Sequence, residues 1–457
     1  MAKQRKKDRA KSVMELPVIR PDAAGVDIGA TEICVAVGAD REAKPVRKFG
    51  AFTRDLVAIA DWLTAVKIRT VAMESTGVYW IPLFQHLEAK GFEVLLVNAH
   101  HIKNVPGRKT DVSDAQWIQF LHAVGLLRGS FRPSQEICAI RSLVRHRESL
   151  VQMASQCILM MQKAMTQMNL QLHNVISSIT GCTGMRILEA ILAGERDPVV
   201  LAKLCREEIK APREVVERSL EGDYRGELLF ILKQNLRHYQ DLQKMIGDVE
   251  QQAGQLMDEL PGQVDLEAKP LPPASKRHKR KPNTPAPLPD LREKQYRILG
   301  TDLTMIPGIN TGTIEVLLSE VGPDLSAFAS ASRFSSWLAL CPNNKESGGK
   351  RISGHTRKQK SRVATALRIA AQSLVFSDTA LGDFHRRMRA KFGPAKAVTA
   401  SAHKLARIVY RLITTGEQYD ESVFGRAQEK HRRHQEAKLK ATAKKFGYQL
   451  IPIQEAA

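Results

Sequence analysis

Four acidic residues have the types and settings needed for metal-assisted chemistry. Asp111 and Asp114 lie three residues apart in the stretch DVSDAQWI, while Asp27 and Glu74 lie in the apolar stretches GVDIGA and TVAMES. Carboxylates are the hard oxygen ligands that hold Mg²⁺ or Mn²⁺ in proteins. Two such ions about 3.5–4 Å apart can activate one oxygen and stabilise another during phosphoryl transfer.

The pair Asp111 and Asp114 also has a purely structural interpretation. If a helix begins near 111, Asp111 as N-cap and Asp114 at the third helical position would satisfy free backbone amides. The same helix would project both side chains from one face, with Cβ atoms about 5–6 Å apart. Taken alone, the pair favours the cap. Asp27 is expected mid-strand, where a carboxylate is costly unless it is solvated, paired or bound to a cation, and Glu74 at a strand end where ligands gather in open α/β sheets. Together with these two residues, the pair indicates a metal site. The two roles are compatible.

Ser347 is the candidate nucleophile, in the stretch KESGGKRISG. A serine followed by two glycines is most often a flexible turn. However, glycines also let a phosphate approach the hydroxyl, and the neighbouring cations lower the cost of anionic charge. Serine is a weak nucleophile until a base or a metal activates it. Ser347, acting with a metal site elsewhere, could therefore attack a DNA phosphate and hold the strand covalently.

The charge balance points to a polyanionic partner. Lys and Arg number 69 against 48 Asp and Glu, which gives a formal net charge of +21. From Ser347 to Ser377 there is no acidic residue, whereas a merely solvated surface usually mixes both signs. This stretch therefore predicts a phosphate-binding surface. Its candidate residues are Lys350, Arg351, Arg357, Lys358, Lys360, Arg362 and Arg368.

Several other classes of protein are disfavoured. No run of about 18 apolar residues or signal-type segment occurs, which argues against a membrane protein. The six cysteines are scattered without a CxxC pair, as expected for a reducing cytoplasm and against a zinc site. The motif VDIGAT also opens the actin and sugar-kinase ATPases. Their second phosphate hairpin is missing here, and so is a P-loop.

The elements that must position the acidic residues are predicted from residue patterns. Residues 25–97 give three short strands, then a helix, a strand, a second helix and a buried strand. This order predicts a mixed sheet with helices around it, the order of the ribonuclease-H-like fold. The methionine-rich stretch near 139–170 has helical spacing and predicts a long helix packed in a core or against a partner chain.

The chain is long enough for several domains. We expect an α/β domain followed by mainly helical regions, joined by a segment whose proline and lysine content suits an exposed linker. The expected divisions are a basic tail (1–20), the α/β catalytic domain (21–138), a coiled-coil-like helical region (139–260), the linker (261–295), a mainly helical C-terminal domain (296–425) and a second basic tail (426–457).

These motifs resemble a known family. GVDIGATEICVAV, the stretch from Met73 to Leu127, FSSWLALCPNNKESGGK and the stretch from Ala371 to Tyr410 are similar to DEDD transposases of insertion sequences of the IS110/IS1111 type. The resemblance covers about 22–425, and the second of these stretches is highly specific. The linker and the tail after 425 look longer than the family core.

The resemblance implies more than the residues alone. It implies a RuvC-like domain whose four acidic residues match Asp27, Glu74, Asp111 and Asp114, and a C-terminal transposase domain whose nucleophilic serine matches Ser347. It also implies a phosphoserine intermediate, a composite site across subunits of a dimer or tetramer, and a structured guide RNA that pairs with donor and target DNA. Such a protein would work in the bacterial cytoplasm, at the nucleoid.

Two other functions remain open. A RuvC-like structure-specific endonuclease of the Holliday-junction resolvase kind would use water as the nucleophile, leaving Ser347 incidental. A non-catalytic nucleic-acid-binding protein would need only the basic segments. Ser347→Ala should abolish strand exchange by a recombinase but leave cleavage by an endonuclease. If Asp27→Asn and Asp114→Asn left strand cleavage untouched, the metal site would be refuted and a binding protein would be favoured.

Overall fold

The computed structural model describes residues 16–75, 77–99, 102, 113–274, 288, 290–357, 359 and 361–448, without the side chains of 345, 351, 426–432 and 434–435. The chain divides into two compact units, Met1–Arg132 and Pro133–Ala457, and each is described by itself. Among the described residues, every helix is too short or too polar to cross a bilayer.

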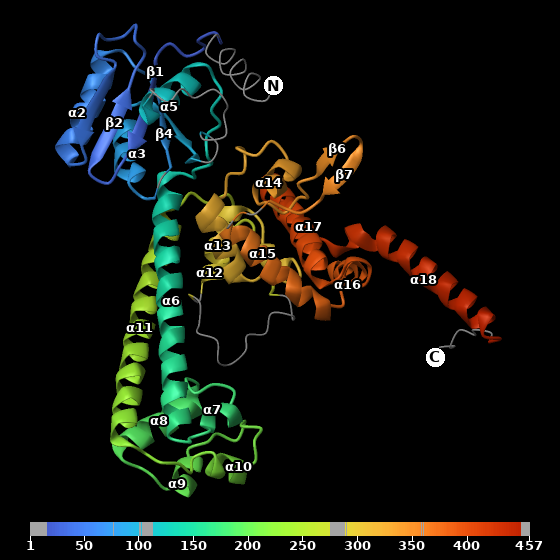
Figure 1. Cartoon of the computed structure of the whole chain (residues 1–457). Coiled ribbons are helices and arrows are strands. Elements are labelled where there is room, and N and C mark those ends of the chain that lie inside the picture. The colour runs from blue at the N-terminus through green and yellow to red at the C-terminus, as the bar shows by residue number, and fades with distance from the viewer. Residues whose placement is uncertain are drawn as a thin grey trace. The chain divides into compact units, whose positions relative to one another are not determined.

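Unit 1 contains the five-stranded mixed sheet that the sequence predicts (Figure 1). The strand order is β3-β2-β1-β4-β5, antiparallel among β1, β2 and β3 and parallel among β1, β4 and β5. The strands are β1 (Ala23–Ile28), β2 (Glu32–Ala36), β3 (Val46–Gly50), β4 (Thr70–Glu74) and β5 (Glu93–Val97). The helices are α2 (Thr53–Ala65), α3 (Trp80–Ala89) and α5 (Asp114–Ala123).

Helices cover both faces of this sheet. On one face, Val26, Ile33 and Val71 pack in one core with α2 and α3 residues such as Leu63 and Leu87. On the other face, Ala72 and Val97 pack against Trp117, Ile118 and Leu121 of α5. Because strand side chains alternate between faces, the odd-numbered residues of β1 point toward α5. Asp27 therefore lies on the α5 face.

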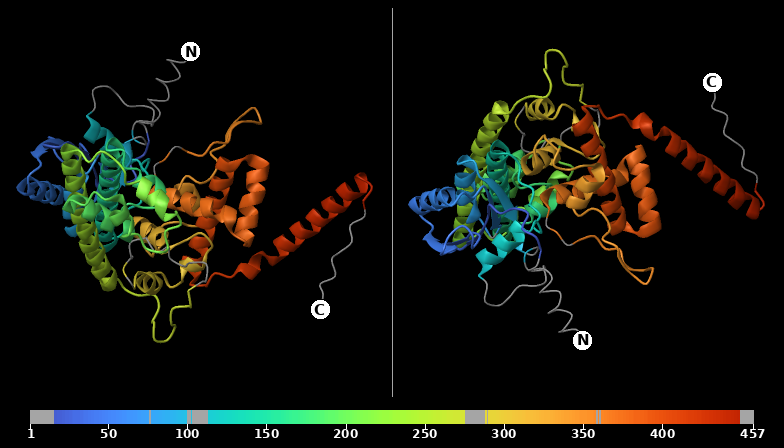
Figure 2. Two further views of the ribbon diagram at one scale, coloured as in Figure 1. Left: turned by 90° about the horizontal axis from the view of Figure 1, so that it is seen from below. Right: turned by 90° about the horizontal axis from the view of Figure 1, so that it is seen from above.

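Unit 2 is mainly helical, as predicted. The helices α6 (Gln135–Gln167) and α11 (Gly226–Glu259) lie side by side (Figures 1 and 2). The short helices between them are α7 (Leu172–Val175), α8 (Cys182–Ala193), α9 (Pro198–Ala202) and α10 (Arg213–Arg218). Met161, Met165 and Met168 are buried in the core that α6 shares with these short helices, which confirms packing as the role of these methionines.

The C-terminal part of unit 2 contains a small two-stranded hairpin. Its elements are α12 (Leu291–Leu299), η2 (Leu303–Met305), α13 (Thr311–Val321), α14 (Ala331–Trp337), β6 (Lys345–Ser347), β7 (Lys350–Ser353), α15 (Arg362–Ser373), η3 (Leu374–Phe376), α16 (Ala380–Phe392), α17 (Pro394–Thr415), η4 (Glu421–Phe424) and α18 (Gly425–Lys445). The helix α12 begins inside the stretch expected to be a linker, of which 275–287 and 289 lie outside the described residues.

Candidate catalytic site and nucleic-acid interface

Asp27 and Glu74 are brought together by the pairing of two parallel strands. Val26 of β1 is the register partner of Met73 of β4, and each acidic residue comes next along its strand. Neighbouring strands lie about 4.8 Å apart, so the two carboxylates project side by side from the same face. Both residues are half-buried, at the carboxyl ends of their strands. In parallel α/β sheets this edge is where ligands bind.

The helix α5 brings Asp114 to the same face. Gly25 lies two residues before Asp27, and a Cβ atom there would overlap the backbone of Ala115 and Gln119. The Gln119 side-chain amide also donates a hydrogen bond to the carbonyl of Ala23 at 3.3 Å. The backbone of α5 therefore lies directly on β1. Asp114, exposed at the start of this helix, is held at the face from which Asp27 projects.

Cys34 is a further residue at this face, and our sequence analysis did not single it out. It is the antiparallel register partner of Asp27, so the two side chains point to the same side of the sheet. Burial and the charge of Asp27 raise the pKa of the Cys34 thiol; Lys48 opposes this, and Asp114 adds to it. The thiol therefore lies close enough to both carboxylates for their charges to raise its pKa. The period-two alternation of β2 is the sequence signal that could have identified it.

The chemistry of these donors suits a hard divalent cation. Carboxylate oxygens from two strands and a helix are the ligands that Mg²⁺ and Mn²⁺ prefer. Asp111 lies outside the described residues, and among those described no three His, Cys, Asp or Glu side chains form a cluster able to hold an ion. A complete ligand set would therefore draw on Asp111 or on rotation of the carboxylate side chains.

The prediction that Asp111 caps the helix is wrong, because a different residue forms the cap. The N-cap of α5 is Ser113, whose hydroxyl accepts a hydrogen bond from the Gln116 backbone amide at 3.3 Å. The Gln116 side chain in turn accepts from the Ser113 backbone amide at 3.2 Å, which completes a capping box. Asp114 is thus the first helical residue rather than the third. Because Ser113 already caps the helix, Asp114 is not needed for that purpose.

Ser347 lies at the turn end of a β-hairpin whose register shifts between Lys345 and Glu346. It pairs with Lys350 across a two-residue turn formed by Gly348 and Gly349, whose φ angles are 55° and 73°. Two successive positive φ values define the turn type best matched to strand twist, and they explain why both residues are glycine. The Ser347 side chain is exposed. The hairpin therefore presents the hydroxyl to solvent beside a lysine.

The predicted phosphate-binding residues lie in different settings. Lys350 is exposed on β7, whereas Arg368 is half-buried on α15. Arg357 donates a hydrogen bond to the carbonyl of Ser336. Lys358 and Lys360, together with the side chain of Arg351, lie outside the described part of the structure.

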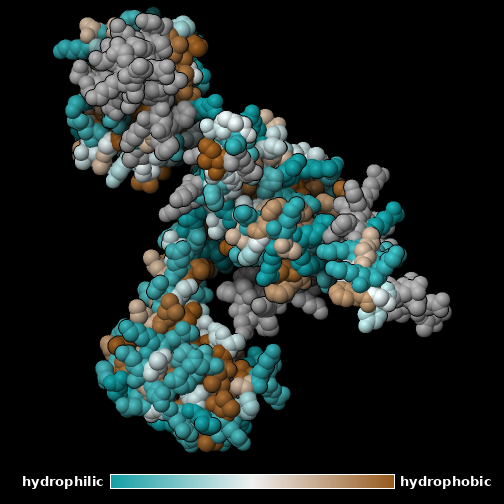
Figure 3. All heavy atoms as spheres, turned by 45° about the vertical axis from the view of Figure 1, so that its right-hand side comes forward, coloured by the Kyte–Doolittle hydropathy of each residue, from teal (hydrophilic) through white to brown (hydrophobic). Residues whose placement is uncertain are grey.

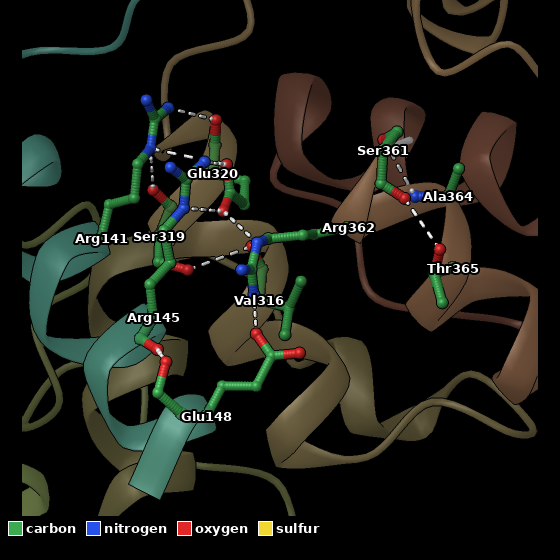
Figure 4. A network of polar contacts seen from close by, with 11 residues as sticks. Arg141, Arg145, Glu148, Val316, Ser319, Glu320, Ser361, Arg362, Ala364 and Thr365 are labelled. Atoms are coloured by element: carbon green, nitrogen blue, oxygen red, sulfur yellow. Dashed lines mark hydrogen bonds and ion pairs between the residues drawn. The ribbon is translucent and has the colours of Figure 1, made fainter. Parts of the chain in front are cut away.

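Arg362 differs because carboxylates of the same unit engage its guanidinium group (Figure 4). It forms an ion pair with Glu148 of α6, and its Nε lies 3.7 Å from Oε1 of Glu320 on α13. Glu320 also accepts two hydrogen bonds from Arg145, at 2.8 and 2.7 Å. Arg141 donates to the backbone carbonyls of Ser319 and Glu320. The cluster joins α6, α13 and α15.

Comparisons with known proteins place these features in a family. A family model of DEDD transposases of the IS110 type matches residues 24–170, and the model "Transposase IS116/IS110/IS902 family" matches residues 300–386. Together they span just over half of the chain. The "Putative transposase y4pF/y4sB" of Sinorhizobium fredii is 31% identical over 128 residues, which is 26% of this chain and 32% of that relative.

Proposed function

Because the chain belongs to the IS116/IS110/IS902 family of transposases, we propose that it is a DNA recombinase that cuts and rejoins strands through Ser347. In this proposal unit 1 is a RuvC-like domain of the ribonuclease-H-like fold. Its residues Asp27, Glu74, Asp111 and Asp114 hold Mg²⁺ or Mn²⁺. Residues 296–425 form the transposase domain that carries the nucleophile.

The convergence of three carboxylates on one face of the sheet supports this proposal most directly. Asp27 and Glu74 follow a register pair of adjacent parallel strands, and α5 lies against β1 with Asp114 at its start. Carboxylates grouped on one face repel one another, and a divalent cation bound between them offsets that repulsion, so such a grouping favours a bound cation. The bound ion would supply charge stabilisation at the scissile phosphate.

The covalent step consists of two exchanges at phosphorus. The Ser347 hydroxyl loses its proton and its Oγ forms a bond to phosphorus, while the ester bond to the departing strand end breaks. That end takes up a proton and leaves as a hydroxyl. A second strand's hydroxyl then attacks the phosphoserine, which restores the phosphodiester and returns the serine hydroxyl. The number of phosphoester bonds is unchanged, so the exchange needs no external energy source.

The partners in this proposal are donor DNA, target DNA, a structured guide RNA and further copies of the chain. The acid-free stretch from Ser347 to Ser377 supports contact with nucleic acid. Large apolar side chains at the surface of α6 and α11 support association between copies (Figure 3). Examples are Met153, Leu159 and Phe230, which are 51%, 57% and 62% exposed.

Substitution of the serine tests the reaction class. With Mg²⁺, guide RNA and labelled DNA from the element's ends, the wild-type chain should give a protein–DNA adduct that survives denaturation. Mass spectrometry should place the phosphate on Ser347, and Ser347→Ala should abolish both adduct and strand exchange. If Ser347→Ala still cleaves DNA, water is the nucleophile and the protein is an endonuclease. If wild type and Asp27→Asn bind DNA equally and neither cleaves it, the protein is a binding protein.

Mixing two inactive variants tests whether subunits share an active site. Asp27→Asn protein and Ser347→Ala protein are each expected to be inactive. If one subunit supplies the acidic residues and another supplies the serine, an equimolar mixture should regain part of the strand exchange. A mixture as inactive as its components would show that each subunit uses its own acidic residues and serine.

A further inference from the structure

A large groove opens in the C-terminal part of unit 2. It encloses about 1600 Å³ between α16, α17, η4 and the residues Gly354–Thr356. This exceeds the roughly 300–1,000 Å³ of a typical small-molecule site, so its size suits a polymer segment. Gly354 follows β7 directly, which makes the groove continuous along the chain with the hairpin that carries Ser347.

One wall of the groove is a row of basic side chains on α17. Lys396, His403, Lys404 and Arg407 recur at helical spacing, opposite the face on which Leu405 is buried. The whole of α17 contains no acidic residue. Within the described part of the chain, neither Lys404 nor Arg407 forms an ion pair with a carboxylate. These side chains are therefore available to an external anion. These residues give no clear signal in the sequence because they are spread along one helix rather than clustered.

The opposite wall and the floor are aromatic and apolar. Phe384, Met388, Phe392 and Phe424 line the groove, and Phe392 is 48% exposed. Lys404 lies between two of these rings, with Nζ 4.5 Å from the centre of Phe384 and 4.6 Å from that of Phe424. Burial and the charge of Arg387 lower the pKa of Lys404. A nearby phosphate would relieve this unfavourable setting of the ammonium group.

Gln418 also lines the groove. Its side-chain oxygen accepts from the Asp302 backbone amide at 3.2 Å. Its side-chain nitrogen is buried and has no partner within the described residues. Buried polar groups without partners are rare in proteins and often indicate a missing ligand or water. The two carboxylates that line the groove are engaged within the chain: Glu417 pairs with Arg411, and Asp420 accepts hydrogen bonds from Ser422. Lys396, Lys404 and Arg407 therefore remain as charged donors that suit a ligand rich in acceptors.

We propose that this groove binds a segment of unpaired nucleic acid, with phosphates at Lys396 and Arg407 and a base against Phe392. A duplex hides the faces of its bases, so it could use the outer cations but not the aromatic wall. Single strands use both, because each base offers a face for stacking. This inference rests on the proposed function, since cleavage and exchange of DNA expose single strands beside the Ser347 hairpin.

Binding measured without metal tests the inference independently of catalysis. The full chain, in EDTA, is titrated against a fluorescent single-stranded oligonucleotide and against a duplex of the same length, and anisotropy is followed. Phe392→Ala and Arg407→Gln should each weaken single-strand binding about tenfold. Phe392→Ala should leave duplex binding within about twofold, because a duplex cannot use the aromatic wall. Arg407→Gln should also reduce the salt slope of single-strand binding by about 0.7.

Matched substitutions outside the groove control for general effects. Phe52 is exposed just before α2 and Arg237 is exposed on α11, so Phe52→Ala and Arg237→Gln remove the same groups elsewhere. We expect both to bind single strands within about twofold of wild type. Ultraviolet crosslinking of an iodouracil-containing single strand should attach it to Phe392 or its neighbours in the groove.

Three results would overturn the inference: equal weakening of duplex and single-strand binding by Phe392→Ala, equal weakening of single-strand binding by the control substitutions, or crosslinks only outside the groove. Because no strand is cleaved in EDTA, each of these results leaves the recombinase proposal standing. Conversely, if the wild-type chain forms no Ser347 adduct, the groove measurements remain valid.

Discussion

Asp27 of β1 and Cys34 of β2 face each other as register partners, on the side of the sheet that α5 covers. A thiol beside a candidate ligand for Mg²⁺ gives the site an affinity for softer ions. We expect Cd²⁺ to bind there and to produce the ultraviolet absorption of a cadmium–thiolate bond. Cys34→Ser should remove this band, and Mg²⁺ in excess should compete with it. Cys182 is exposed on α8, so Cys182→Ser is the matched control. A band that survives Cys34→Ser would contradict the expected placement.

Removing the charge of a proposed ligand should stop the reaction without weakening DNA binding. Asp27→Asn and Asp114→Asn keep the side-chain shape, so we expect cleavage to fall by at least about a hundredfold while affinity for DNA in EDTA stays within about twofold. Asp61→Asn on the exposed side of α2 is the matched control and should cleave normally. Cleavage by both site variants at the wild-type rate would refute the metal site.

Acid should loosen α5 through His122. This side chain is buried, with Nε2 2.8 Å from Oγ1 of Thr70, and burial together with the charge of Arg20 lowers its pKa to about 4. The unfolded chain takes up a proton on this residue below about pH 6.5, while the folded chain stays neutral down to about pH 4. Stability is therefore lost as the pH falls from about 6.5 to about 4, by on the order of 2 kcal/mol.

Hydrogen exchange can measure this effect locally. After correction for the intrinsic rate, protection of the α5 amides should fall between pH 7 and pH 5 in the wild-type chain. His122→Gln keeps a polar group near Thr70 but does not titrate, so its α5 protection should change less. The same loss of protection in both proteins would rule out His122 as the cause.

The sequence of strands and helices along unit 1 was predictable because each strand and helix carries its own residue pattern, from GVDIGA to EVLLVNA. The residues that meet through pairing were harder to predict. Cys34 lies opposite Asp27 only because of the register in which β1 and β2 pair. Ser113, and not Asp111, is the N-cap of α5 because the Gln116 side chain completes its capping box. Arg362 looked like a phosphate ligand because its partners, Glu148 and Glu320, are distant in sequence.

The absence of a side chain at Gly25 should be essential to the acidic site. A Cβ atom there would overlap the backbone of α5, which cannot rotate away as a side chain could. We expect Gly25→Ala to destabilise unit 1 by about 1–3 kcal/mol and to reduce cleavage by displacing Asp114. Gly247→Ala is the contrasting control, because open space surrounds Gly247 within α11 and alanine favours helix by up to about 1 kcal/mol. Denaturant unfolding would measure the loss of stability, and hydrogen exchange of the α5 amides would report the displacement of α5. Unchanged α5 protection in Gly25→Ala would show that the contact is dispensable.

Glu320 should hold α6, α13 and α15 together, because three arginines approach it. Its side chain is 12% exposed and pairs with Arg145 at 2.7 Å, Arg141 at 3.5 Å and Arg362 at 3.7 Å. Glu320→Gln would leave these cations without their shared carboxylate. We expect a loss of about 2 kcal/mol, less than the roughly 3–5 kcal/mol of a fully buried pair, since Arg145 and Arg362 are partly exposed.

Salt and DNA binding give this prediction two separate readouts. High salt should recover part of the stability of Glu320→Gln, because it screens the repulsion among the arginines. Affinity for DNA should rise, since Arg362 is then less restrained and can contact phosphate. Glu217→Gln on α10 removes only a pair with Arg213 at 3.7 Å on the surface, so its loss should stay below about 0.5 kcal/mol. If Glu320→Gln loses no more stability than this control, the arginines are held by other contacts and the carboxylate does not join the three helices.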